Sequence, residues 1–574
     1  MLEYLAPGVF VEETSFRSKS IEGVSTSTTA FVGPTRTGPV GEIPELLTSF
    51  ADFERTYGGL DNLAFGGAGD PRINYLAHAV MAYFNEGGAR LYVARVAPAG
   101  GIAVGADLVA AKTSKFRARF PGAVGSGTIV LEQVAALSSA AGAAAVIDGS
   151  LMRVRGNPAA TPPVAAGLFV KRNGAWSGST GAAKVFGAAD EALGMELLTL
   201  TVTTIDADGT STQYDGLGFD PLHKRFVGTM LRPNPTRRAE AISQQFAFEV
   251  AATVTPFELQ AATTPDAGSP VKTLRLSYGA DAVPALADWQ AALKILEGLE
   301  DVAIVAAPGH TEFAATAAGV ANELRVHAEK RRSYRIAVLD VPRGSTPSEA
   351  REFKARIDSK YAALYYPWVV TPNPDFDSAD PRLDAELTLP PSGFLCGIYA
   401  RSDLERGVWK APANEVLRTA LRFERLVNTG EQEVLNPLGV NCLRYFAGRG
   451  HRVWGARTTS SDPEWKYVNI RRYFLYLEHS IDRGTQWSVF EPNGERLWAN
   501  VRETVTAFLH NEWVGGALLG DKPEQAFFVK CDRSTMTQND LDNGRLICLV
   551  GVAVIKPAEF VIFRIGQKTA EARS

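Results

Sequence analysis

The sequence predicts a multidomain chain with α/β and α+β folds. An α/β core carries an inserted, mostly β region, and a C-terminal α+β domain follows it. At 574 residues the chain is long enough for roughly four domains of about 150 residues each. Helix and strand patterns alternate in residues 28–100 and 280–430, whereas residues 101–279 are rich in Ala, Gly, Thr and Pro. Hydrophobic residues make up 45% of the chain, which excludes a protein that is disordered throughout.

Residues 1–27 are predicted to form an N-terminal arm and linker. After Pro7-Gly8, the run at residues 9–13 has the composition of a short strand, and residues 15–27 are polar and weakly patterned. A short strand followed by a linker cannot bury its own faces. We therefore expect this strand to pair with a sheet edge elsewhere.

The core is predicted to be a discontinuous α/β domain of residues 28–100 and 280–430. Buried runs alternate in it with helical patterns, and breakers such as Gly33-Pro34 and Gly58-Gly59 separate them. Such alternation indicates a sheet covered by helices on both faces. The expected strands lie at 29–33, 91–96, 302–306, 334–339 and 364–370, and the expected helices at 50–57, 74–85, 286–296, 314–330, 350–361 and 412–425.

Residues 101–279 interrupt the core and are predicted to be mostly β. Short strand-like pieces recur at 127–133, 195–205 and 273–278, and residues 135–145 are nearly of low complexity. Because the region lies inside the sequence of the core, we expect it to project outward from that domain.

Residues 431–558 are predicted to form the C-terminal domain, and residues 559–574 a C-terminal arm. The helices expected at 468–481 and 497–513 each have one apolar face. Strand-like runs follow at 526–531, 546–555 and 560–565. The last run comes after Pro557 and can leave the domain, so the chain has an unpartnered strand near each end.

Charge, cysteine usage and hydropathy narrow the function classes. The chain has 59 Lys and Arg against 63 Asp and Glu, whereas proteins that rely on phosphate contacts are usually basic, so we expect no nucleic-acid partner. The four cysteines form no C-x-x-C pair, which favours isolated thiols in a reducing compartment over disulfides. We find no signal-peptide pattern and no run that could span a bilayer. These features predict assembly in the cytoplasm of the producing cell and no membrane insertion.

No catalytic or cofactor motif is complete in the sequence. The chain has no Gly-Lys or His-Glu dipeptide, which excludes a P-loop and an H-E-x-x-H zinc site, and it has no G-x-S-x-G or G-x-G-x-x-G. The aspartates of residues 375–384 lack EF-hand spacing, although calcium binding stays an alternative there. We expect no catalytic residue, cofactor or metal. The basic clusters at 449–452 and 471–472 fit a solvated face or a contact with an acidic protein partner.

Several segments near the two ends resemble contractile tail sheath proteins. Residues 5–13, LAPGVFVEE, resemble the opening of those proteins, and residues 28–39, TTAFVGPTRTGP, the start of their sheath domain. Further similar segments follow in the same order and spacing: VWGART at 453–458, the helix that begins NIRR at 469, EPNGERLW at 491–498, and GGALLG at 515–520. The resemblance covers roughly residues 1–100 and 280–574, and the region between follows no pattern of the family.

The resemblance implies a structural protein. Its subunits would form a homo-oligomeric helical sheath of stacked rings, usually sixfold, around an inner tube protein, with baseplate and terminal cap proteins as further partners. Contraction would drive the tube through a target envelope. Phage tails, pyocins, type VI secretion systems and extracellular injection systems share this plan, so the particle would be released or stay cell-associated according to the system.

Two unpartnered strands on one chain suit β-augmentation, in which each strand is added to the sheet of a neighbouring subunit and completes its C-terminal domain. The inner-tube contact is expected on the helix at 497–513 and its flank. For strand exchange we predict Gly8, Val9, Phe10, Val11, Glu12, Glu13, Phe560, Val561, Ile562, Phe563, Arg564 and Ile565. For the receiving sheet we predict Phe527, Phe528, Val529, Leu546, Cys548 and Val550, and for the tube contact Arg496, Arg502 and His510. Another self-assembling phage structural protein, and an enzyme with an unrecognised α/β site, are the alternatives.

Overall fold

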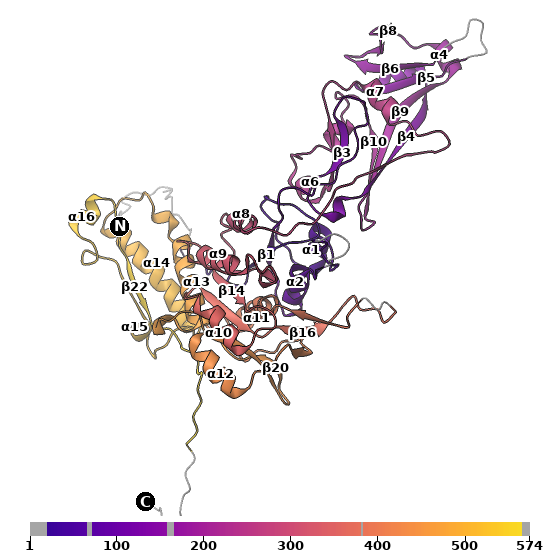
Figure 1. The fold of residues 1–574 in the computed structure, drawn as a ribbon. Helices are drawn as coiled ribbons and strands as arrows, with labels where there is room; N and C mark the ends of the chain where they lie inside the picture. Colours follow the sequence, from indigo (N-terminus) through magenta and orange to yellow (C-terminus); the bar gives the residue numbers. More distant parts are fainter. Residues whose placement is uncertain (1–19, 66–71, 158–165, 380–382, 565–574) are drawn as a thin grey trace, which may run out of the picture.

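The computed structural model describes residues 20–65, 72–157, 166–379 and 383–564. At its centre lies a seven-stranded sheet in the order β2-β1-β13-β14-β15-β19-β20 (Figure 1). The strands from β2 to β19 run parallel, and β20 pairs with β19 in antiparallel fashion at one edge. These strands are β1 (Thr29–Gly33), β2 (Leu91–Arg95), β13 (Ile304–Ala306), β14 (Ile336–Asp340), β15 (Ala362–Tyr366), β19 (Val440–Phe446) and β20 (Gly450–Val453).

Helices cover both faces of this sheet, as the alternating pattern predicted. On β1, Phe31 packs in the apolar cluster of one face, while Ala30 and Val32 pack in the cluster of the other. The first face carries α1 (Phe50–Tyr57), α2 (Tyr75–Asn85) and α11 (Pro391–Glu405). The second carries α8 (Leu286–Leu296), α9 (Ala317–Glu329), α10 (Pro347–Ala355) and α12 (Thr429–Leu435).

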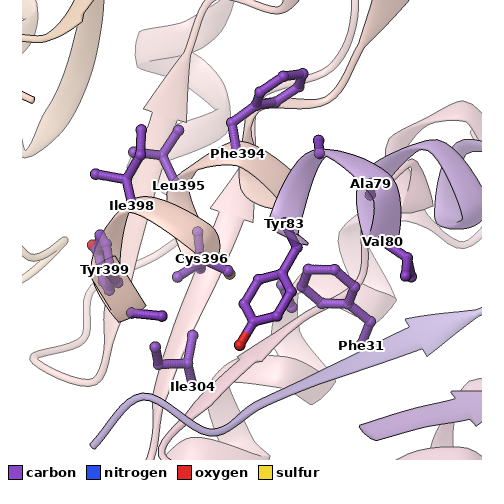
Figure 2. Packing of buried hydrophobic residues seen from close by; sticks show 14 of the residues in the cluster. Phe31, Ala79, Val80, Tyr83, Ile304, Phe394, Leu395, Cys396, Ile398 and Tyr399 are labelled. Atoms are coloured by element: carbon purple, nitrogen blue, oxygen red, sulfur yellow. The ribbon is translucent and has the colours of Figure 1, made fainter. Parts of the chain in front are cut away.

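The sequence pattern did not predict α11, which is buried on every side from Pro391 to Ser402. Figure 2 shows its side chains packed beside α2 and β1. A Cβ atom on Gly393 would lie 2.7 Å from Ala79 Cβ, and one on Gly397 would lie 2.5 Å from the Tyr83 carbonyl oxygen, so these glycines permit the close approach of α2. A helix without a polar face has no amphipathic signal, which is why the pattern search missed it.

Two other expected elements differ in the structure. The strand expected at 364–370 is divided at the cis Tyr366–Pro367 bond: β15 stays in the main sheet, and β16 (Val369–Pro372) joins a separate sheet with β17 (Glu386–Leu389) and β18 (Arg422–Phe423). The helix expected at 412–425 is absent. Its backbone bonds instead to the β20 strand, for example from Asn414 N–H to the Val453 oxygen at 2.7 Å.

Residues 101–279 project from the core as an elongated, mostly β region (Figure 1). Its longest strands, β4 (Thr128–Ser138) and β9 (Met195–Ile205), pair along their whole length. The same sheet contains β5 (Leu151–Val154), β6 (Gly167–Arg172), β7 (Ala175–Gly178), β8 (Ala183–Lys184), β10 (Ser211–Leu217) and β12 (Lys272–Arg275), and a second sheet pairs β3 (Ser114–Ala118) with β11 (Phe246–Val250). The short helices are α3 (Ala140–Ala145), α4 (Ala188–Leu193), α5 (Val227–Met230), α6 (Arg238–Ser243) and α7 (Pro256–Ala262).

A C-terminal α+β unit packs beside the core. It contains α13 (Val468–Gly484), α14 (Glu495–Val514), α15 (Pro523–Ala526), β21 (Phe527–Lys530), α16 (Gln538–Asp542) and β22 (Leu549–Val552). Residues 440–453, which the sequence analysis assigned to this domain, instead extend the core sheet as β19 and β20, because β19 pairs with β15. Within the described ranges, no helix is long and apolar enough to cross a membrane.

Candidate assembly surface

The C-terminal unit is built on two antiparallel helices. Leu477 of α13 packs in one apolar cluster with Val505 and Leu509 of α14. Near the opposite ends of the helices, the Glu512 carboxylate accepts hydrogen bonds from the hydroxyls of Tyr473 at 3.1 Å and Tyr476 at 2.8 Å. Burial and the nearby Glu512 raise the pKa of both phenols. The two helices are therefore joined both by apolar packing and by hydrogen bonds.

The segment before β1, predicted to be a polar linker, is held against α13 from residue 20 onward. Ile21 is buried, and Val24 N–H donates to Ser480 Oγ at 3.2 Å. Gly23 lies directly on the Tyr476 ring, where a Cβ atom would come within 2.2 Å of the phenolic oxygen. The predicted strand residues Gly8 to Glu13 lie outside the described residues. The described chain therefore begins beside the C-terminal unit.

A buried ion pair fastens this junction. Asp403 of α11 accepts hydrogen bonds from Arg472 Nη1 at 2.8 Å and Nη2 at 2.6 Å, and from the Thr26 hydroxyl at 2.7 Å. Both charged side chains are 3% exposed. Burial disfavours the charged form of Arg472, but the Asp403 carboxylate outweighs this effect and raises the pKa of the guanidinium. The pair thus joins the core, the C-terminal unit and the N-terminal segment.

The two basic clusters noted in the sequence, at 449–452 and 471–472, differ in their burial. Arg471 and Arg472 are buried, and Arg471 donates to the Glu478 carboxylate at 2.9 Å, so the expectation of a solvated or partner-binding face is wrong for both residues. Arg449 in the β19–β20 turn and Arg452 of β20 both bond to Asn414; Arg449 is exposed and Arg452 is half-buried. The twin arginines of α13 therefore act in internal packing.

A second polar cluster anchors the start of the C-terminal arm on the core. Glu559 accepts bonds from Arg457 Nε at 2.8 Å and Nη2 at 2.6 Å, from Asn436 Nδ2 at 2.8 Å and from the Tyr467 hydroxyl at 2.9 Å. Burial works against the charged carboxylate, but these bonds prevail and lower the pKa of Glu559 to about 2. The sequence analysis placed Glu559 in the C-terminal arm and gave it no anchoring role; the structure instead bonds it to its own core.

The arm beyond Glu559 is exposed and apolar. Phe560, Val561, Ile562 and Phe563 are between 69% and 82% exposed, and Arg564 is exposed as well. Residues 560–564 pair with no strand of the described chain, and Ile565 lies outside the described residues. Figure 1 shows this segment running away from the body of the molecule. Four consecutive large apolar side chains are thus open to contact with another surface.

The receiving sheet expected from the sequence is a two-stranded pair. Phe527 lies opposite Val552 and Lys530 opposite Leu549, and among the described residues no third strand pairs with β21 or β22. Phe528 is 59% and Val550 39% exposed. Phe527 and Val529 pack partly buried against the helix cluster. The pair therefore has free edges and exposed apolar side chains.

Leu546 and Cys548 do not belong to a strand of this pair, because β22 begins at Leu549. They lie in the approach to β22, partly buried against the helix cluster. The approach is held by a loop contact: the Thr535 hydroxyl donates to the Ile547 carbonyl at 2.7 Å. In a strand, the Ile547 carbonyl could accept a hydrogen bond from a neighbouring strand. Here the Thr535 hydroxyl already occupies it.

Of the three residues predicted to contact an inner tube, Arg502 and His510 line one groove and Arg496 does not. Arg496 and His510 are exposed on α14 and lie near one another in helical projection. Arg502 is half-buried and donates to the Cys531 carbonyl at 3.3 Å, at the end of β21. An open groove separates α14 from β21; Arg502, His510 and Phe528 are among the residues that line it. In the described ranges, no cluster of three or more His, Cys, Asp or Glu side chains could hold a metal ion.

Comparison with known proteins places these features in a family. The family model "Phage tail sheath protein central domain" matches residues 283–459, and "Phage tail sheath C-terminal domain" matches the adjoining residues 460–568. The chain belongs to the phage tail sheath family. The resemblance of the segments between 453 and 520 is thereby confirmed, whereas the segments at 5–13 and 28–39 lie outside both matches. The matched regions of this sheath-family chain include the part of the α/β core from α8 onward, α13, α14 and the β21–β22 pair.

Relatives and solved structures agree with this assignment. The sheath-family chain is 27% identical over 46% of its length to a prophage major tail sheath protein of Pseudomonas aeruginosa strain UCBPP-PA14. It matches 64% of that relative, and thus less than two thirds of its length. An extracellular contractile injection system sheath, the PVC sheath in its contracted state, matches 100% of both chains with 21% identity and a TM-score of 0.53. The contracted helical sheath of the anti-feeding prophage matches 98% of this chain and 100% of its own, with 22% identity and a TM-score of 0.53. At these identities the structural likeness concerns the fold.

Proposed function

We propose that the protein is a structural subunit of a contractile sheath, which polymerises as stacked rings around an inner tube and contracts to drive the tube through a target envelope. The observation that carries this proposal is the exposed apolar arm at residues 560–564, which starts at the Glu559 anchor. The β21–β22 pair of the same chain has no third strand among the described residues. An arm and an acceptor on the same chain are the requirements for self-assembly by strand addition.

Strand exchange is the link between neighbouring subunits in this proposal. Residues 8–13 of one subunit and 560–565 of another add to the edges of a third subunit's β21–β22 pair. Because arm and acceptor are different surfaces of the same chain, the contact is heterologous and generates rings or helical filaments rather than closed dimers. Hydrogen bonds along an edge satisfy the unpaired backbone groups of both strands, and the acceptor's exposed Phe528 and Val550 cover apolar arm side chains.

The two anchors explain how such a mesh could survive contraction. The N-terminal arm starts from the junction of Thr26, Asp403 and Arg472, and the C-terminal arm starts from Glu559 and Arg457. Both starting points are fixed to rigid, buried parts of the subunit. Rotation of subunits is then absorbed by the segments outside the anchors while the strand pairing persists.

The exposed side of α14 is the proposed contact with the inner tube. Arg496 and His510 lie on it, and Arg502 lies at the adjacent groove. Exposed ion pairs contribute only about 0–1 kcal/mol each, so a tube contact of this kind holds through repetition and releases readily. The inserted region, residues 101–279, faces outward in this arrangement, and baseplate and terminal cap proteins bind the ends of the sheath. The protein has no catalytic role and assembles in the cytoplasm.

Electron microscopy of the purified full chain in negative stain tests assembly and strand exchange together. We expect long cylinders from the wild type and dispersed monomers from the double variant Val561→Asp/Phe563→Asp, because two carboxylates on the arm oppose its burial. Deletion of residues 1–14 should also abolish polymerisation. Val185→Asp is the matched control, because Val185 is 91% exposed but lies on the inserted region.

Each alternative predicts a different image. Cylinders of normal length from the arm variants would refute strand exchange while leaving the sheath assignment intact. Closed shells from the wild type would support another phage structural protein, and monomers with measurable turnover would support an enzyme. For the tube contact, co-assembly with the tube protein is compared between wild type and Arg496→Glu/Arg502→Glu; unchanged co-assembly would refute that assignment.

A further inference from the structure

Cys531 and Cys548 lie opposite each other at one end of the β21–β22 pair. Lys530 is the partner of Leu549 in the antiparallel register, so the next residues outward along the two chains, Cys531 and Cys548, also face each other. The two thiols are close enough for each to influence the pKa of the other, and both side chains contact the apolar cluster of the C-terminal unit. The sequence analysis treated the four cysteines as isolated, because 531 and 548 show no recognisable spacing.

The type of strand pairing favours a covalent bond at this position. Ala553 N–H donates to the Ala526 carbonyl at 2.7 Å, and hydrogen-bonded and non-hydrogen-bonded pairs alternate along antiparallel strands. The Lys530–Leu549 pair is therefore hydrogen-bonded, and the Cys531–Cys548 pair is not. The Cα atoms of non-hydrogen-bonded pairs are about 4.5 Å apart, which is within the range that a disulfide spans.

The two thiols differ in access, and the other two cysteines are remote from them. Cys531 is buried, whereas Cys548 is partly exposed. Cys396 and Cys442 are buried in the α/β core, in the apolar clusters on opposite faces of its sheet. A reagent in solution can thus reach Cys548, and Cys531 is the thiol placed to react with it next.

We propose that Cys531 and Cys548 form an oxidisable pair, which becomes an intrasubunit disulfide when the protein meets a small-molecule disulfide such as oxidised glutathione. The Cys548 thiolate attacks one glutathione sulfur, and one glutathione thiolate leaves. The Cys531 thiolate then attacks the Cys548 sulfur of the mixed disulfide, and the second glutathione leaves. The protein loses two protons and two electrons, and the oxidant is reduced to two thiols.

Burial makes this reaction slow near neutral pH. It raises the pKa of the Cys531 thiol, and it raises the pKa of the Cys548 thiol to about 12. The charged neighbours are Arg502 of α14, whose charge favours both thiolates, and Asp532, whose charge disfavours that of Cys531. Because only the thiolate attacks, the pair stays reduced while subunits are made and oxidises over longer exposure.

The disulfide has a structural consequence that rests on the proposed function. It closes the loop of residues 532–547 and ties together the two strands that receive the arms. A sheath assembled in a reducing compartment would acquire this bond after release, once the arms have been added to the acceptor strands. The bond then protects the acceptor sheet from local opening.

The experiment is a peptide map of the full-length protein incubated with oxidised glutathione at pH 8.5, then alkylated and digested with trypsin. We expect a linked pair of peptides, residues 531–533 and 546–564; the second is long because trypsin does not cut between Lys556 and Pro557. Alkylatable thiols in the denatured protein should fall from four to two. Cys531→Ser should give no linked pair and leave Cys548 as a mixed disulfide with glutathione, and Cys396→Ser should retain the linked pair.

Two results would overturn the proposal: four alkylated cysteines after prolonged oxidation, or linkage of Cys548 to a cysteine other than Cys531 of the same chain. Oxidised and reduced protein are also compared by peptide hydrogen exchange, in which residues 527–530 and 549–552 should exchange at least tenfold more slowly once oxidised. The peptide map is measured on unassembled protein, so disulfide formation and sheath assembly are tested separately. Either of them can fail while the other succeeds.

Discussion

Removal of the buried Asp403 carboxylate should strongly destabilise the junction between core and C-terminal unit. Arg472 would keep its charge at a site where its side chain is 3% exposed, and it would lose the two bonds at 2.8 and 2.6 Å that compensate for burial. Breaking a buried pair by removing one partner costs about 3–5 kcal/mol. We therefore expect Asp403→Leu to lower the free energy of unfolding by about 3–5 kcal/mol. This range includes the loss of the hydrogen bond from the Thr26 hydroxyl.

A double-mutant cycle separates the charge from the packing. Asp403→Leu, Arg472→Met and the double variant are followed by scanning calorimetry, and the transition of the core should fall by roughly 10 °C in Asp403→Leu. The double variant should lose much less than the sum of the two single variants, because it leaves no buried charge unpaired. Thr26→Val is the matched control: it removes one neutral donor to the same carboxylate and should cost about 1 kcal/mol.

Two results would refute this reasoning. A melting temperature of Asp403→Leu within about 2 °C of wild type would mean that Arg472 finds other partners or solvent. Strictly additive single and double variants would mean that the two charges do not stabilise each other in the folded protein.

Three further predictions follow from the same structure. Glu559→Gln should release the start of the C-terminal arm, seen as faster proteolysis of residues 557–564; because the pKa is lowered to about 2, the stabilisation is present above pH 4.5 and is lost as pH falls towards 2. Gly393→Ala should cost about 1–3 kcal/mol in thermal unfolding, because its Cβ would meet the α2 backbone at 2.8 Å, whereas Gly494→Ala, with open space around it, should cost little. Acid should destabilise the core from pH 6.5 downward, by up to about 1.4 kcal/mol per pH unit for each histidine that is buried uncharged, and His→Gln variants should flatten this slope. Burial lowers the pKa of these histidines, His78, His310 and His327, to about 4.

The long amphipathic helices show where sequence pattern was sufficient. α13 and α14 extend the predicted ranges 468–481 and 497–513 by a few residues, because one apolar face of each must be buried whatever the partner. The alternation of strands and helices likewise indicated a sheet covered on both faces. The two wrong helix predictions concern segments without a single apolar face to bury. Helix α11 has no polar face, so the pattern missed it. Residues 412–425 make their backbone hydrogen bonds to β20 rather than within a helix.

The sequence by itself determined the family and the presence of an apolar strand pattern near each end, because both are local properties of short segments. Only the tertiary structure decided that Arg472 is buried against Asp403, that Glu559 anchors the C-terminal arm through Arg457, and that Cys531 faces Cys548. In each case the partners are far apart in the chain. A side chain's chemistry predicts that a buried charge or thiol needs a partner, but only the packing of the elements that carry both groups selects which one it meets.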